Sequence, residues 1–395
     1  MESKRLELKM RIVYLVFFGA MAAFLPFLTV YLQAKGLDYG EIGILLAVFS
    51  ITGVIVQPIW GYLTDKYLDK QKTILILMLG SAVAALAFSI SYTFLALLLS
   101  IILFLSFHSP IVPVLDAYSY EIIEDHRSIL YGRLRVMGSL GYALSALGMG
   151  LVVNTMGVTP IFFFYTGFIL IATAFTLRIR HQGESTYEKL KMADVGRLLK
   201  DNRFLVYILA LGIMNIAIGS TNSYLPILVL ETGGQLGHIG LISFMIAMSE
   251  LPFFFFGDSF IKKYGVLNIF GIGMVVYAGM YFADSFLRNY VAVLFVQLFQ
   301  GVAFSFFIIA GLHYLNSIVA QNMKTTAMTL YGAVTGVGHF TGNAAGGFLL
   351  ENATVFLLFR ILAFVALIAF VFVLILKRTD RRQHDILDSG GENLS

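Results

Sequence analysis

The chain has 395 residues, of which 58% are hydrophobic and only 13% are charged, and its mean hydropathy is +0.84. Soluble domains carry about 25% charged residues, so this composition excludes a soluble enzyme, a nucleic-acid-binding protein and a disordered scaffold. The net charge of +4 is a small excess, and its placement along the chain matters more than its total. The sequence has no Cys, which excludes disulfides, thiolate metal sites and cysteine nucleophiles.

Twelve apolar runs follow one another along the chain. Each is long enough to cross a bilayer as a helix, which takes about 20 apolar residues, and none alternates as barrel strands do. The predicted spans cover residues 12–33, 41–63, 73–91, 94–120, 130–153, 159–178, 204–229, 237–257, 266–284, 289–316, 326–350 and 352–376. The first run is too long for a signal peptide, so we expect it to remain as a span. The sequence therefore predicts an all-α membrane protein with twelve transmembrane helices.

The basic residues predict the orientation of these spans. All but Lys35, Arg288 and Arg360 of the 27 Lys and Arg residues fall at one side of the membrane when both termini are placed inside. Basic residues gather at the cytoplasmic ends of transmembrane helices. We therefore expect a multi-pass protein of the cell (inner) membrane with both termini in the cytoplasm.

The chain reads as a duplicated unit. Leu25-Pro26-Phe27-Leu28 in the first span returns as Leu225-Pro226-Ile227-Leu228 in the seventh, and spans five and eleven are both rich in glycine. Parallel six-helix repeats around a midplane site are an architecture of secondary transporters. We expect an N-terminal six-helix half (1–178), a cytoplasmic linker (179–203), a C-terminal six-helix half (204–377) and a cytoplasmic tail (378–395).

Two motifs carry a family resemblance that covers nearly the whole chain. The stretch from Gly61 to Lys66, GYLTDK, follows the second span, and residues 131–141, YGRLRVMGSLG, open the fifth. Together with twelve spans and a central basic loop, they resemble the major facilitator superfamily. They are similar in particular to the branch that holds lactose permease, phenylpropionate permeases and nucleoside symporters. The resemblance implies two pseudo-symmetric six-helix halves that work by alternating access.

Asp116 and Arg135 are ionisable residues inside predicted spans, where such groups are costly and usually functional. They lie equally far from the turn of one helical hairpin, which predicts that they sit at one depth and form a pair. An alternative is a buried ion pair that only fixes helix packing. In the resembling permeases an acid-Ala-aromatic sequence and G-R-x-R bind sugar hydroxyls, which implies substrate binding by Asp116 and Arg135.

Glu250 lies alone near the middle of the eighth span, with no basic residue beside it in the sequence. A desolvated carboxylate favours its neutral form and can take up and release a proton. The resembling family has an acid-Leu sequence there that contacts substrate, so Glu250 is a candidate for both substrate binding and proton coupling. The alternative is a protonated side chain bonded to the backbone carbonyl that Pro252 leaves free.

Further candidates are weaker. The substrate-binding candidates are Tyr142, which can stack on a ring, and the amides Asn222 and Gln300; His313, with Asp116, is a further candidate for proton coupling. The His and Glu that couple protons in span ten of lactose permease are missing, since Gln300 and Ala303 stand there. The resemblance assigns Gly61, Asp65 and Lys66 to a loop that latches the conformation.

The sequence thus predicts a secondary transporter that imports a sugar, nucleoside or aromatic acid, with a proton as the coupling ion. The alternative is a proton-driven efflux antiporter of drugs or metabolites. An enzyme, a sensor and an ATP-driven pump are disfavoured, because no catalytic cluster, signalling domain or phosphate-binding loop is found. We expect a monomer whose partners are a small-molecule substrate, a proton and the lipid bilayer, without nucleic acid, metal or cofactor.

Overall fold

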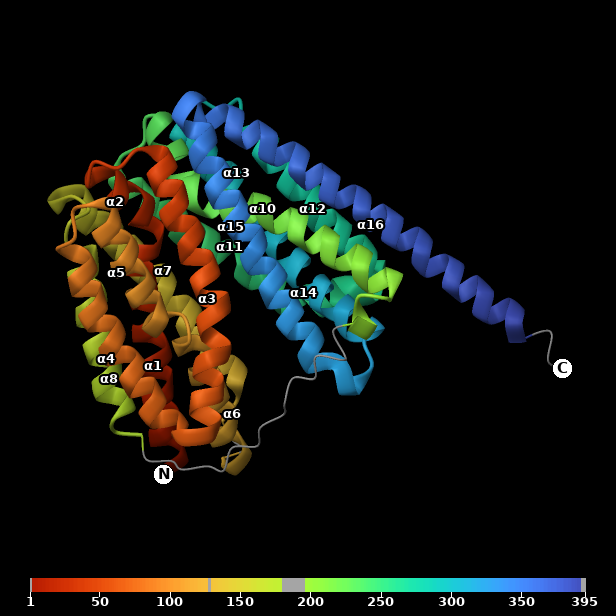
Figure 1. The fold of residues 1–395 in the computed structure, drawn as a ribbon, viewed down its shortest axis with the longest axis horizontal. Helices are drawn as coiled ribbons and strands as arrows, with labels where there is room; N and C mark the ends of the chain where they lie inside the picture. The colour runs from red at the N-terminus through yellow and green to blue at the C-terminus, as the bar shows by residue number, and fades with distance from the viewer. Residues whose placement is uncertain (1, 127–128, 180–195, 392–395) are drawn as a thin grey trace.

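The computed structural model describes residues 2–126, 129–179 and 196–391, which form helices and no strand (Figure 1). The first bundle contains α1 (Glu2–Phe24), η1 (Leu25–Phe27), α2 (Leu28–Ala34), α3 (Tyr39–Tyr67), α4 (Lys70–Ser89), α5 (Phe94–His108), α6 (Ile111–Asp125), α7 (Tyr131–Met156) and α8 (Ile161–Thr176). The second bundle contains α10 (Asn202–Glu231), α11 (Leu236–Tyr264), α12 (Val266–Asp284), α13 (Tyr290–Gln297), α14 (Gln300–Ile318), η2 (Gln321–Met323), α15 (Lys324–Asn352) and α16 (Val355–Gly391).

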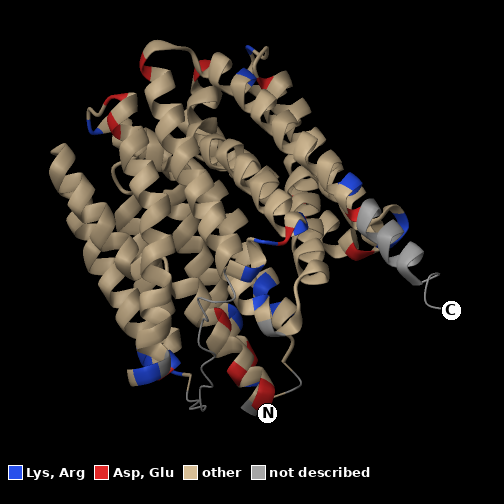
Figure 2. Ribbon diagram, turned by 45° about the vertical axis from the view of Figure 1, so that its right-hand side comes forward, with Lys and Arg blue, Asp and Glu red and all other residues tan. Residues whose placement is uncertain are grey.

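These helices make the chain an integral, multi-pass membrane protein. Ten helical segments in the described residues are long and apolar enough to cross a membrane. The other two predicted spans are helices as well, but α8 has only 16 residues, and α15 is made less apolar by its Gly, Thr and Asn residues. Figure 2 shows that most charged residues lie toward the helix ends. The all-α membrane fold is confirmed, whereas the number twelve stays a prediction.

Short polar turns set where the helices begin. Asp38 starts α3 with a capping box, in which its side chain accepts from Glu41 N and Glu41 accepts from the backbone of Asp38. Asp69 caps α4 by accepting from the backbone N–H of Lys72 at 2.7 Å. Partial burial tends to raise the pKa of Asp69, but the hydrogen bonds from Lys72 outweigh it and lower that pKa. The cap is therefore charged at neutral pH.

Three of the predicted spans are interrupted helices. The predicted span 12–33 contains the 3-10 turn η1 at Leu25–Phe27, between α1 and α2. The predicted span 94–120 divides into α5 and α6 at Ser109 and Pro110, where the proline ring cannot continue a helix. The predicted span 289–316 divides into α13 and α14 at Leu298 and Phe299, where there is no proline. The break after α5 follows 15 helical residues and the break after α13 follows eight, so the two lie at different depths of their spans.

The two bundles pack mainly within themselves and meet along two helix crossings. In the first bundle α1 lies against α7 and α8, and in the second α10 lies against α15 and α16. Between the bundles, α3 crosses α15 and α7 crosses α11. We call the end of the molecule that holds the turns at 35–38 and 232–235 the far end, and the opposite end, with the turn at 67–69 and residues 126, 129 and 130, the basic end. Figure 1 shows the bundles together at the far end and diverging toward the basic end.

Glycines bring the backbones of the two bundles into contact near the far end. A Cβ added to Gly43 of α3 would lie 2.8 Å from the Cα of Gly347 in α15, and one added to Gly240 of α11 would lie 2.2 Å from Ala146 O in α7. Real Cβ atoms do not approach that closely, so only glycine fits at these crossings. Thr29 adds a hydrogen bond between the bundles, from its hydroxyl to Ser223 O at 2.5 Å.

Toward the basic end the bundles are apart. Ile55 and Ile59 of α3 are 58% and 52% exposed, and they directly follow Val54, where α3 still contacts Gly336 of α15. A Cβ on Gly332 of α15 or on Gly61 of α3 would meet nothing within 4 Å. The described structure is therefore closed at the far end and open at the basic end.

The far-end contact predicts a conformational effect of Gly347→Leu, because the new side chain would occupy the space of the α3 backbone. Since the chain has no Cys, a single Thr29→Cys substitution reports on the far end, where Thr29 is 3% exposed. We expect a maleimide to alkylate this cysteine several-fold faster in the Gly347→Leu background. Gly332→Leu, on the same helix, is the matched control and should leave the rate unchanged. Equal rates in both backgrounds would show that the Gly43–Gly347 contact does not close the far end.

Candidate substrate and coupling site

Asp116 is held by the first helix of the chain. The hydroxyl of the buried Tyr14 donates to Asp116 Oδ1 at 2.6 Å, joining α1 to α6. A hydrogen bond to an ionised acceptor is stronger than one between neutral groups. The half-buried carboxylate thus has a fixed orientation, and the Tyr131 hydroxyl of α7 is a second hydrogen-bond donor beside it.

Arg135 is held by the same face of α1. Its guanidinium lies 4.4 Å from the ring centre of Phe18. Phe18 is one turn after Tyr14 on α1, and the rings of Tyr14 and Phe18 are stacked with their centres 6.1 Å apart. Gly138 makes this possible, because a Cβ there would lie 2.8 Å from the Phe18 ring. The glycines of α7 are close-packing positions, as the sequence suggested.

The predicted ion pair between Asp116 and Arg135 is not present. No described basic nitrogen lies within 4.0 Å of the Asp116 carboxylate, and each of the two residues instead contacts α1. The hairpin argument fixed their depth but not the direction in which each side chain leaves its helix. The stacked rings of Tyr14 and Phe18 occupy α1 beside both groups.

Glu250 faces the first bundle from α11. It is half-buried and lies within electrostatic range of Arg135 of α7, the helix that α11 crosses. Tyr142 of α7 and Tyr277 of α12 lie within electrostatic range of the same carboxylate. Glu250 thus has no basic residue beside it in the sequence, but in the fold Arg135 of the opposite bundle lies within electrostatic range of its carboxylate.

Gln300 lies beside Glu250 where α11 crosses α14. A Cβ on Gly301 would be 2.2 Å from Ser249 O, so the two backbones touch, and the Ser305 hydroxyl donates to Glu250 O at 3.3 Å. Gln300 is buried, and its Oε1 has no hydrogen-bond partner among the described residues. The crossing therefore brings two candidates, Glu250 and Gln300, together.

Asn222 and His313 lie apart from this group. Asn222 is exposed on α10. His313, in the last turns of α14, places Nε2 3.0 Å from Asp258 Oδ1, and both side chains are exposed. Asp258 follows Glu250 by eight residues on α11, a rise of about 12 Å toward the basic end. The structure does not bring His313 to Glu250.

The predicted conformational loop lies at the basic end of α3. Lys66 donates to Tyr62 OH at 2.7 Å and lies over the rings of Tyr62 and Tyr67, so its contacts are local. The space beside Gly61 is open. The side chain of Asp65 lies outside the described residues.

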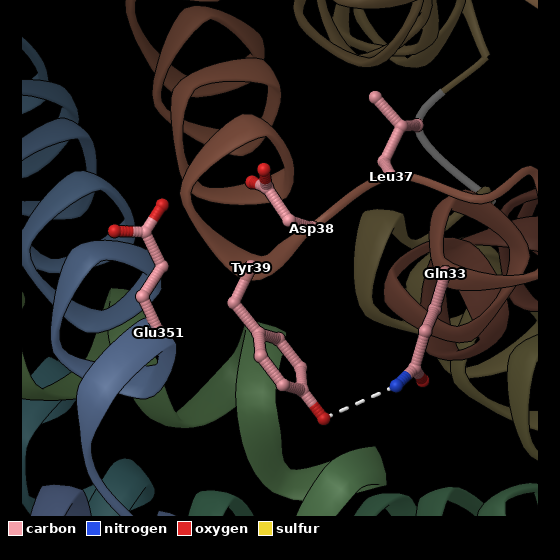
Figure 3. A pocket seen from close by; sticks show the side chains of 5 residues that line it. All are labelled: Gln33, Leu37, Asp38, Tyr39 and Glu351. Atoms are coloured by element: carbon pink, nitrogen blue, oxygen red, sulfur yellow. Dashed lines mark hydrogen bonds between the residues drawn. The ribbon is translucent and has the colours of Figure 1, made fainter.

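A pocket of about 250 Å³ opens at the far end (Figure 3). Its lining includes Gln33, Tyr39 and Glu351, and Gln33 donates to Tyr39 OH at 3.1 Å. A Cβ on Gly40 would lie 1.9 Å from Glu351 Oε1, so this carboxylate of α15 rests on the first turn of α3. The pocket belongs to the closed contact between the bundles and contains none of the predicted site residues.

Sequence reasoning missed the aromatic residues that hold the site. Tyr14, Phe18 and Tyr277 are three among 57 Tyr, Phe and Trp residues, and nothing in their local sequence separates them from lipid-facing rings. Asp284 ends a predicted span, a position typical of solvated acids, yet it is fully buried. Its sequence signal is an acid at a span end followed by Gln297 in the next span.

A polar site between two membrane-embedded helical bundles, open at one end of the molecule only, is the arrangement of a membrane transporter. The chain belongs to the MFS_1 like family, whose model matches residues 7–361. It is a transporter of the major facilitator type, and the fold resemblance expected from the sequence is confirmed.

Relatives and solved structures agree with this family. The chain is 27% identical over 381 residues to the uncharacterized transporter YwbF of Bacillus subtilis, covering 94% of both chains. It is 27% identical over 370 residues to the maltose permease of Geobacillus stearothermophilus, covering 92% of this chain and 93% of the permease. The crystal structure of the nucleoside transporter NupG superimposes with a TM-score of 0.85 at 17% identity, over 94% of this chain and 98% of that one. These relatives are transporters rather than enzymes.

The missing ion pair predicts that Asp116→Asn folds normally. Breaking a fully buried ion pair costs about 3–5 kcal/mol, but this substitution breaks none, and the new amide oxygen can still accept from Tyr14. We expect expression and thermal stability of the purified variant close to wild type. Tyr14→Phe, which removes the donor, should be the less stable of the two.

Restored expression in a double variant would contradict this prediction. If Asp116→Asn expresses poorly and adding Arg135→Gln restores it, the two residues are paired in the membrane and the arrangement described above is wrong.

Proposed function

We propose that this protein imports a small organic solute together with a proton by alternating access, and that the solute is a sugar, a nucleoside or an aromatic acid. The observation that carries the proposal is the position of Arg135 and Glu250 on opposite bundles, in a molecule closed at the far end and open at the basic end. The maltose permease and nucleoside transporter names among the similar proteins support this substrate range.

The proposed substrate site combines charged and ring-binding groups. Asp116 and Arg135 would accept from and donate to hydroxyl or amide groups of the solute, and Tyr142 would stack on its ring. Gln300 and Glu250 would complete the site from the second bundle, and Asn222 would add an amide from α10. A solute that contacts both bundles binds with an affinity that depends on how the bundles are placed relative to each other. Binding therefore shifts the equilibrium between the conformations.

The proposed proton carrier is Glu250, with Asp116 and His313 as the other candidates. An ionised Glu250 attracts Arg135 across the crossing of α7 and α11, and protonation cancels the attraction. In low dielectric such an interaction is strong, so a proton changes how firmly the two bundles hold together. Binding of the solute and binding of the proton therefore both affect the contact between α7 and α11.

The proposed topology places the basic end in the cytoplasm of the cell. The halves would be residues 1–178 and 204–377, joined by the 179–203 linker and followed by the 378–395 tail. Gly61, Asp65 and Lys66 would then form a cytoplasmic latch between conformations, and the open end of this structure would face inward. The protein is proposed to act as a monomer.

Glu250→Gln tests the proton carrier, because it mimics the permanently protonated side chain. We expect loss of uphill accumulation in proteoliposomes with an imposed pH gradient, while counterflow exchange continues, since exchange needs no deprotonation. Asp258→Asn, on the same helix but paired with His313, is the comparison and should accumulate normally. Unimpaired accumulation by Glu250→Gln, or its loss in Asp258→Asn, would move the coupling away from Glu250.

Reporter fusions test the topology. Fusions at Gln182 and Ser395 should both read cytoplasmic, because the basic residues of the chain gather on that side. An external reading at either point would contradict the proposed orientation.

Uptake assays test the substrate class and the direction. Purified protein is first screened for thermal stabilisation by sugars, nucleosides and aromatic acids, and the stabilising solute is then supplied on either side of oriented vesicles. Proton-driven uptake supports the proposal, and proton-driven extrusion would establish an efflux antiporter instead.

A further inference from the structure

A buried polar group in the second bundle takes no part in the proposed mechanism. Asp284, the last residue of α12, and Gln297, the last of α13, both have 0% exposure. Gln297 Nε2 donates to Asp284 Oδ2 at 2.7 Å. Tyr281, one turn before Asp284, lies within electrostatic range of it and beside Thr221 of α10. Three helices therefore bring polar side chains to one buried point.

Oxygen atoms at this point lack hydrogen-bond partners. Asp284 Oδ1 and Gln297 Oε1 are buried and unpartnered among the described residues. The buried hydroxyls of Thr221 and Tyr281 face each other and have no third partner among the described residues. Buried polar atoms nearly always have a partner, so such a concentration calls for an explanation. All four are oxygens that can donate lone pairs to a ligand.

No basic side chain compensates the carboxylate of Asp284. None of the ion pairs among the described residues includes it. Arg288, the nearest basic residue along the chain, donates to the carbonyl oxygens of Ser285 and Leu287, and its guanidinium lies 3.6 Å from the ring centre of Phe356. A buried carboxylate is stabilised by protonation, by a basic partner or by a bound cation, and here no basic partner is present among the described residues.

The break between α13 and α14 points to the same place. It occurs without proline, and the N–H groups of Leu298 and Phe299 bond three residues back, to Phe295 and Val296. A helix kink without proline usually has another cause, such as an inserted group. The negative end of the α13 dipole lies at Gln297, and broken half-helices of transporters bind cations with such C-terminal ends.

The break between α5 and α6 in the first bundle has a different structure. There α5 ends at His108, the break contains Pro110, and His108 Nδ1 lies 2.8 Å from Tyr165 OH, which donates to Ser81 at 2.9 Å. Ser109 Oγ is buried there without a partner among the described residues, but the break has no carboxylate. The second break contains no proline, and it follows eight helical residues, whereas the first follows 15.

We propose that Asp284, Gln297 and the C-terminal end of α13 bind a sodium ion, with Thr221 and Tyr281 as further oxygen ligands. Hard cations are bound by oxygen atoms, and a single carboxylate balances a single positive charge. A divalent ion would leave a net charge buried in low dielectric, which is costly. The site is distinct from Glu250 and joins α10, α12 and α13.

The test is equilibrium binding of radioactive sodium to the purified, full-length protein in detergent, with choline as the replacing cation. The wild type should bind one sodium ion per chain, saturably. Asp284→Asn should abolish binding, and Thr221→Val should weaken it by roughly tenfold, as loss of one supporting group does at metal sites. Glu250→Gln is the matched control, an acid neutralised in the same bundle, and should bind sodium normally.

Three outcomes would overturn the proposal: no saturable sodium binding by the wild type, undiminished binding by Asp284→Asn, or equal loss in Glu250→Gln. The elution of each variant from a sizing column is measured alongside. If Asp284→Asn is aggregated, sodium binding is measured in Thr221→Val and Gln297→Leu instead. Normal sodium binding by both variants would overturn the proposed site. Because binding is measured without transport, a failure of the proposed import leaves this test unaffected.

Discussion

Backbone contact between the two bundles at the far end is the constraint on which the rest of this structure depends. Gly43 meets Gly347, and Gly240 meets the backbone of α7, at distances that leave no room for a Cβ. Helices are stiff over their length, so a close contact near one end fixes how far apart they stand at the other. The open basic end, and access to the polar residues between the bundles, follow from these glycines.

The packing of the two bundles also determines which charged residues interact. Ionisable groups in a membrane need a partner or a cavity, and here Arg135 and Glu250 lie within electrostatic range of each other because α7 crosses α11. An interaction within one bundle does not sense the movement of the other. One that spans the crossing changes whenever the bundles move, which makes it suited to link a bound charge to conformation.

The sequence predicts the helices well and their neighbours less well. Apolar runs of the right length, and glycine-rich spans that pack closely, follow from local composition, and Gly138 and Gly347 occupy such contacts. The height of Asp116 and Arg135 along their hairpin also follows from residue counting. Which way each side chain points does not, because Tyr14 and Phe18 arrive from a distant part of the chain and hold the two charges separately.

The break between α5 and α6 can be predicted from the sequence, whereas the break between α13 and α14 cannot. The two breaks also differ in chemistry. Pro110 marks the first break in the sequence, whereas nothing beside Gln297 marks the second, since polar side chains and turn geometry there depend on α10 and α12. Both bundles have a broken helix, but the first break follows 15 helical residues and the second only eight. Among the described residues, the first bonds His108 to Tyr165 and leaves Ser109 Oγ unpartnered, and the second leaves oxygens of Asp284 and Gln297 unmatched. Unmatched oxygens therefore occur at both breaks, but only those at the second include a carboxylate, the group that can balance the charge of a cation.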